Sequence, residues 1–141
     1  MGLQDEFTES RGWPAVLEER SDIAATPAVY ALLHERPFGR LRGESAILYI
    51  GCTGEFGGTS DRCRLRIYRY PNGAHAQEIH NRTRRLEDDG VAVSLAWTQL
   101  LSREDAFALE AHMLQQYEAE HGELPPFNRR GPQTRRDDRA A

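Results

Sequence analysis

Short apolar runs alternate with longer polar stretches along the chain, and the apolar runs mark the expected strands. Residues 28–33 and 46–50 are apolar segments of strand length, separated by a polar connector, residues 34–45, that holds Pro37 and Gly39. Two such runs around a connector predict an antiparallel β-hairpin. Residues 91–100 alternate larger apolar side chains with small or polar ones, which predicts a third strand.

Three segments have helical character, and they cover residues 61–69, 75–86 and 102–121. The third is the clearest, because Ser102-Arg-Glu-Asp105 has the spacing of a capping box and Gly122 follows the last periodic residue. The predicted order is β-β-α-α-β-α. It indicates an α+β fold in which helices flank a small, three-stranded, mainly antiparallel sheet.

A chain of 141 residues is long enough for one domain with one hydrophobic core. We expect residues 27–130 to form that domain, residues 1–26 to be an accessory acidic segment, and residues 131–141 to be a disordered tail. No apolar window approaches the length of about 18 residues that a membrane span needs, and the N-terminus has no signal-peptide pattern. Two cysteines are too few for a disulfide framework, so we expect a cytoplasmic protein without a membrane partner.

The basic residues are all arginines, and they are unevenly distributed. The absence of lysine excludes P-loop, Schiff-base and lysine-base chemistry. Residues 62–85 hold seven arginines against one acid, Glu78, whereas the rest of the chain has an excess of acids. Such a local basic field on an acidic body indicates contact with a polyanion, although a solvated helix face would look the same.

Glu110 is the most informative residue of the last helix. Counting in steps of three and four, it falls within an apolar stripe that includes Ala106, Met113 and Tyr117. A carboxylate on a buried face needs an arginine, a hydrogen-bond network or a metal as its partner. A structural salt bridge and a metal site are both consistent with this pattern.

The first predicted helix combines arginine with tyrosine. Arg64 and Tyr68 are four residues apart and share a face, and Arg66 and Tyr70 repeat the same spacing. The guanidinium fork suits phosphate, and a tyrosine hydroxyl donates a hydrogen bond to phosphate or water. These pairs therefore point to a phosphate-contacting face.

Five elements occur in one order: Ala28-Val-Tyr30, Tyr49-Ile-Gly51, an arginine on the next helix, Glu110, and Pro126-Phe-Asn128. In this order they resemble the GIY-YIG nuclease family over residues 27–130. The opening triplet has alanine in place of the family's glycine and valine in place of its isoleucine, and the stretch between Tyr30 and Tyr49 is longer than usual.

The resemblance implies a role for each matching residue. Tyr30 and Tyr49 would position or deprotonate the attacking water, and Arg64, with Arg66 as the rival in register, would contact the scissile phosphate. Tyr68 matches a position often held by tyrosine or histidine, and His75 is similar to a histidine of some homing members. Glu110 matches the ligand of Mg²⁺ or Mn²⁺, and Asn128 matches the asparagine that closes the site.

The resemblance implies a metal-dependent endonuclease that hydrolyses DNA phosphodiester bonds with low or loop-derived sequence specificity; RNA is left open as a substrate. The remaining arginines of the basic region would hold the nucleic-acid backbone: Arg62, Arg66, Arg69, Arg82, Arg84 and Arg85. Three alternatives stay open. They are a minimal restriction endonuclease that uses residues 1–26 and 34–45 for recognition, an inactive nucleic-acid-binding module, and an acidic protein-interaction domain.

Overall fold

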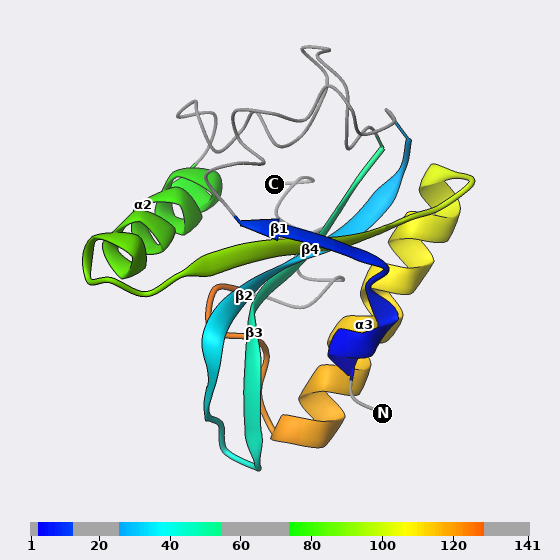
Figure 1. The fold of residues 1–141 in the computed structure, drawn as a ribbon. Helices are drawn as coiled ribbons and strands as arrows, with labels where there is room; N and C mark the ends of the chain where they lie inside the picture. Colours follow the sequence, from blue (N-terminus) through cyan, green and yellow to red (C-terminus); the bar gives the residue numbers. More distant parts are fainter. Residues whose placement is uncertain (1–2, 13–25, 55–73, 129–141) are drawn as a thin grey trace.

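The computed structural model describes residues 3–12, 26–54 and 74–128 (Figure 1). Its elements in chain order are the 3₁₀ turn η1 (Leu3–Glu6), β1 (Glu9–Gly12), β2 (Ala28–Gly39), β3 (Glu44–Thr53), α2 (Ala74–Asp88), β4 (Val93–Gln99) and α3 (Arg103–His121). Among the described residues, no helix is both long enough and apolar enough to cross a membrane.

The strands form one antiparallel sheet in the order β1-β4-β2-β3. The predicted hairpin is confirmed as β2 and β3, in which Tyr30 lies opposite Gly51 and Leu32 lies opposite Tyr49. On the other side of β2, Tyr30 lies opposite Trp97 of β4. The α+β class predicted from the sequence is therefore confirmed.

The predicted number of strands was wrong, because the sheet has four strands rather than three. The additional strand, β1, pairs Ser10 with Ala96 and Arg11 with Leu95. Its sequence, Glu-Ser-Arg-Gly, has no apolar alternation, and most of its residues are exposed. The pairing uses main-chain hydrogen bonds to β4, which leave no signal in the side-chain pattern.

The hairpin is longer than its apolar runs suggested. β2 continues to Gly39 and β3 begins at Glu44, so that most of the polar stretch predicted as a connector lies in strands. The pairing shifts register between Leu33 and Phe38, after which Phe38 lies opposite Ser45. Phe38 packs partly buried against the core, which explains why a polar segment still forms a strand arm.

The two faces of the sheet are covered by different helices (Figure 1). Tyr30, Leu95 and Trp97 belong to the cluster that includes Ile79 of α2. The side chains that alternate with them along the strands face α3. This second cluster includes Val29, Ala31, Ile50 and Ala96 of the strands and Met113 and Leu114 of α3. The pleat of the strands therefore assigns most residues of β2 and β3 to one helix layer or the other, whereas the register shift at Leu33 leaves the neighbours Leu48 and Tyr49 in the same layer.

The ends of α3 agree with the sequence prediction. The Ser102 side chain accepts a hydrogen bond from the main-chain N–H of Asp105 at 3.1 Å, which caps the N-terminus. At the other end Gly122 has a φ of 78°, in the left-handed region, and its N–H donates to the Glu118 carbonyl at 2.8 Å. Local residue types thus determine both ends of this helix.

Candidate functional site

Tyr30 and Tyr49 lie side by side on the face of the sheet that α2 covers. Their ring centroids are 6.1 Å apart, and the rings are tilted by 47°. The register explains the contact, since Tyr30 lies opposite Gly51 and Tyr49 is two residues before Gly51 on the same face. Both tyrosines are buried, with exposed fractions of 2% and 7%.

Gly51 provides the space in which the two rings meet. A Cβ at this position would lie 2.8 Å from Cε2 of Tyr49 and 3.0 Å from the hydroxyl oxygen of Tyr30. Both distances are shorter than ordinary carbon contacts, which lie near 3.5–4 Å, so any side chain here would displace a ring. The glycine of the Tyr-Ile-Gly triplet is therefore required by packing against both tyrosines.

Asn128 is bonded to the main chain of the same triplet. Its Oδ1 accepts from the Ile50 N–H, and its Nδ2 donates to the Ile50 carbonyl, each at 3.0 Å. One residue earlier, the Phe127 N–H donates to the Leu48 carbonyl at 2.8 Å. Phe127 and Asn128 thus form successive hydrogen bonds with the outer edge of β3. The Asn128 bonds hold the main chain of Ile50, between Tyr49 and Gly51.

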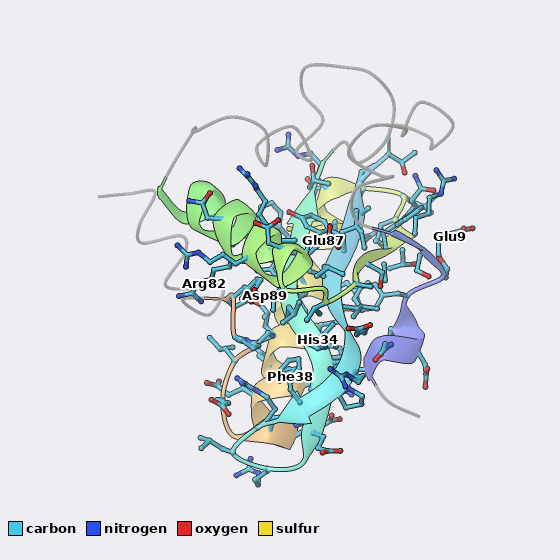
Figure 2. All side chains as sticks on the ribbon, turned by 60° about the vertical axis from the view of Figure 1, so that its left-hand side comes forward. Glu9, His34, Phe38, Arg82, Glu87 and Asp89 are labelled. Carbon is cyan, nitrogen blue, oxygen red and sulfur yellow. The ribbon has the colours of Figure 1, made fainter. Side chains whose placement is uncertain are left out.

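Arg82 holds this segment from the side of α2. Its Nη1 donates to the Pro126 carbonyl at 3.4 Å, and its guanidinium lies 5.7 Å from the centre of the Phe127 ring. Figure 2 labels Arg82 on α2. The sequence analysis assigned Arg82 to the nucleic-acid backbone. In the structure it also links α2 to the chain that carries Asn128.

Glu110 is buried, as its position in the apolar stripe predicts, with an exposed fraction of 2%. It lies on the side of α3 that packs against the sheet, together with Ala106, Met113 and Leu114. The carboxylate takes part in at least one polar or electrostatic interaction, so it is not an isolated buried charge.

The sheet separates the layer of Glu110 from the layer of the tyrosines. The α3 stripe packs with Val29 and Ile50, whose side chains point away from the face that carries Tyr30 and Tyr49. β3 contributes Tyr49 to the tyrosine layer and Ile50 to the α3 layer, and Asn128 lies at the edge of this strand. β3 is therefore the strand that contacts the tyrosine pair, Asn128 and the α3 layer.

Several predicted site residues fall in residues 55–73 and lie outside the described part of the chain: Arg62, Arg64, Arg66, Tyr68 and Arg69. The choice between Arg64 and Arg66 lies outside it for the same reason. His75 belongs by its main chain to the first turn of α2, but its side chain is not described. Arg84 and Arg85 are exposed on α2, as an arginine that contacts a polyanion must be.

Glu110 is the described residue to which the resemblance assigns a metal. Nowhere in the described ranges do three or more His, Cys, Asp or Glu side chains gather as ligands. Mg²⁺ commonly takes only one or two carboxylates and completes its shell with water and substrate phosphate. Glu110 is 2% exposed, so a metal bound in that mode would require its carboxylate to become accessible to water and substrate.

Arg103 was not among the residues that the sequence analysis singled out. Its side chain crosses the main chain of Gly54, where a Cβ would lie 2.7 Å from Nε and 3.0 Å from Cδ. In the sequence Arg103 is only the residue after a helix cap, and Gly54 only one of several glycines in a loop. The contact could have been foreseen only from the packing of α3 along β3.

Comparison with known proteins gave no match: no family model, no curated protein and no solved structure is similar to this chain.

Proposed function

We propose that this protein is a divalent-metal-dependent endonuclease of the GIY-YIG type, which hydrolyses DNA phosphodiester bonds with low or loop-derived sequence specificity. The observation that carries the proposal is the convergence on residues 49–51. Tyr30 and Tyr49 meet over Gly51, and Asn128 bonds both main-chain groups of Ile50. Segments far apart in the sequence thus bring together three elements of the resemblance.

Hydrolysis of a phosphodiester needs a positioned water molecule and a clamp for the negative charge on the phosphate. The Tyr30 and Tyr49 hydroxyls are the groups that would orient the water. A tyrosine has an ordinary pKa near 10, so it accepts a proton at neutral pH only beside a positive charge. The arginine of the family pattern, Arg64 or Arg66, would supply that charge and contact the phosphate.

Glu110 would hold Mg²⁺ or Mn²⁺, which when bound offsets negative charge on the phosphate oxygens. Burial in the α3 stripe fixes the carboxylate, because the side chain has little freedom between packed apolar neighbours. Gly51 and Asn128 act indirectly. The glycine leaves room for the rings, and the asparagine holds the strand segment that carries Tyr49.

The test is cleavage of supercoiled plasmid and of a labelled single strand, each with Mg²⁺, with Mn²⁺ and with EDTA. We expect cutting that needs the metal and is lost in Glu110→Gln. The matched control is Glu118→Gln, which changes an exposed carboxylate on the same helix and should cut like the wild type. Failure of the folded wild-type protein to cut either substrate would overturn the proposal.

A second candidate function is a nucleic-acid-binding module without catalysis. The observation in its favour is that Tyr30 and Tyr49 are almost fully buried and lie in a different layer from Glu110. Binding of DNA at low salt without cutting under any metal condition would support this function.

The restriction alternative relied in part on residues 34–45 to read sequence. In the structure the two arginines of the loop between β2 and β3 contact the last turn of α3 and the residues that follow it. Arg40 donates to the Leu124 carbonyl and pairs with Glu123 at 3.2 Å, and Arg42 donates to the Ala119 carbonyl at 2.6 Å. A discrete fragment ladder from plasmid DNA would favour restriction, whereas a smear would favour low specificity.

A further inference from the structure

We propose that Arg103 binds a backbone phosphate of the nucleic acid at the end of the sheet where β3 finishes, and that Gly54 leaves room for its side chain there. This inference rests on the proposed function, because it assigns a further contact to the same substrate. Four observations carry it: the register of the strands, the packing of Arg103 on Gly54, the exposure of the guanidinium, and the absence of a partner for it among the described residues.

The register brings Arg103 to the end of the sheet at which β3 finishes. Ala28 lies opposite Thr53 on one side and opposite Gln99 on the other, so the last residues of β3 and β4 flank the start of β2. The Leu100 N–H donates to the Pro27 carbonyl at 2.8 Å and keeps the chain at this end. Only the short link 100–102 then separates β4 from Arg103.

Gly54 is the surface on which the side chain of Arg103 rests. A Cβ on Gly54 would lie 3.2 Å from Cγ, 3.0 Å from Cδ and 2.7 Å from Nε of Arg103. Three successive atoms of the Arg103 side chain therefore occupy the space that a side chain at position 54 would need. This contact restricts a side chain that would otherwise lose considerable rotamer entropy when it binds a ligand.

The guanidinium of Arg103 is exposed, and among the residues that the structure describes no hydrogen bond or ion pair uses it. Its nearest acids in sequence, Glu104 and Asp105, lie in the same first helical turn, and neither pairs with it. An exposed arginine without a partner among the described residues is suited to an external anion. Its planar fork matches the oxygens of a phosphate.

Arg103 lies at the end of β3 on the α3 side of the sheet, whereas the tyrosine pair lies on the α2 side. Gly54 is three residues after Gly51, which corresponds to about 10 Å of extended chain. A nucleic-acid strand that runs past the end of β3 would meet this cation. We assign Arg103 to a backbone phosphate at that end of the sheet, as a binding residue and not a catalytic one.

The test measures binding in EDTA, where no cleavage occurs, by fluorescence anisotropy of a fluorescein-labelled single strand and of the duplex at several salt concentrations. Loss of one phosphate contact lowers the slope of log affinity against log salt by about 1. We expect that decrease in Arg103→Gln and an unchanged slope in Arg103→Lys. Arg36→Gln removes an equally exposed charge from the far arm of the hairpin and should leave the slope unchanged.

A second variant tests the role of Gly54. Gly54→Ala retains every charge but places a methyl group where Arg103 lies, so it should lower the slope as Arg103→Gln does. The double variant should be no weaker than either single variant, because both changes remove the same contact. An additive loss would overturn the role of Gly54, and an unchanged slope in folded Arg103→Gln would overturn the phosphate contact.

These results are separable from those for the enzyme itself. A wild-type protein that cuts DNA while Arg103→Gln keeps the full salt slope would refute only the assignment of Arg103. A wild-type protein that does not cut, with the slope lowered in Arg103→Gln, would refute the nuclease and retain the phosphate contact. A wild-type protein that binds neither strand nor duplex would refute both.

Discussion

The Asn128 side chain and the main chain of Ile50 are joined by two hydrogen bonds of 3.0 Å, in which the amide uses both its acceptor and its donor. Asn128 is 6% exposed, so water cannot easily replace these bonds. Outward-facing groups on an edge strand otherwise need a neighbouring strand. The Asn128 amide therefore bonds the N–H and the carbonyl of Ile50 as a neighbouring strand would.

Replacement of this amide should destabilise the fold. In Asn128→Ala both main-chain groups of Ile50 lose their partner in a buried place, which we expect to cost about 1–3 kcal/mol. Urea denaturation followed by circular dichroism measures the change. Gln115→Ala, on the exposed side of α3, should change the free energy of unfolding by no more than about 0.5 kcal/mol. Equal stability of the two variants would contradict the role given to Asn128.

A methyl group at Gly51 should displace the tyrosine rings. Because its Cβ would lie 2.8 Å from Tyr49, we expect Gly51→Ala to cost about 1–3 kcal/mol of stability through overpacking. The comparison is Gly39→Ala in β2, where a Cβ meets no atom within 4 Å. Thermal unfolding of both variants measures the difference, and a Gly51→Ala protein as stable as Gly39→Ala would show that the rings move aside freely.

Arg82 should protect the edge of β3 from local opening. In Arg82→Gln the contacts to Pro126 and Phe127 are lost, so the amides of Phe127 and Ile50 should exchange their hydrogens several-fold faster. Native-state hydrogen exchange measures this rate at each residue. Arg84→Gln removes an exposed charge from the same helix and is the control. Equal exchange in both variants would exclude Arg82 as the anchor of this segment.

The hydroxyl of Tyr117 should contribute little to stability at neutral pH. It is fully buried, and within the described part of the chain its oxygen has no partner in hydrogen-bond geometry. Ser45 and Arg40 lie near enough to affect it without meeting that geometry. We expect Tyr117→Phe to be neutral or slightly stabilising in urea denaturation, because it removes a desolvated group without breaking a bond. A loss above about 1.5 kcal/mol would reveal a bond to this hydroxyl.

The same residue predicts a dependence of stability on high pH. Burial raises the pKa of Tyr117, while the Ser45 hydroxyl and the Arg40 guanidinium lower it only in part. The folded state keeps the Tyr117 proton to a higher pH than the unfolded state does. The contribution of Tyr117 to the free energy of unfolding is therefore constant below the ordinary tyrosine pKa of about 10 and falls as pH rises above it. Tyr117→Phe should remove this part of the decline, as measured by unfolding between neutral and strongly alkaline pH. Parallel curves for the two proteins would contradict it.

The hairpin of β2 and β3, the strand β4 and the helix α3 followed from local chemistry. The apolar runs around Tyr30 and Tyr49 predicted the hairpin, and Ser102 with Gly122 predicted the ends of α3, because strand alternation and helix caps depend on a few neighbouring residues. Burial of Glu110 followed in the same way from helical periodicity.

Contacts between distant segments could not be read from those patterns. β1 pairs through its main chain, Asn128 finds Ile50 across the edge of the sheet, and Arg103 meets Gly54 only because α3 runs beside β3. The sequence by itself determined the central parts of β2, β3, β4 and α3 and the burial of Glu110, since these depend on local propensity and periodicity. Only the tertiary structure decided that the tyrosines and Glu110 lie in different layers, because the choice of face for each helix depends on how the whole core packs.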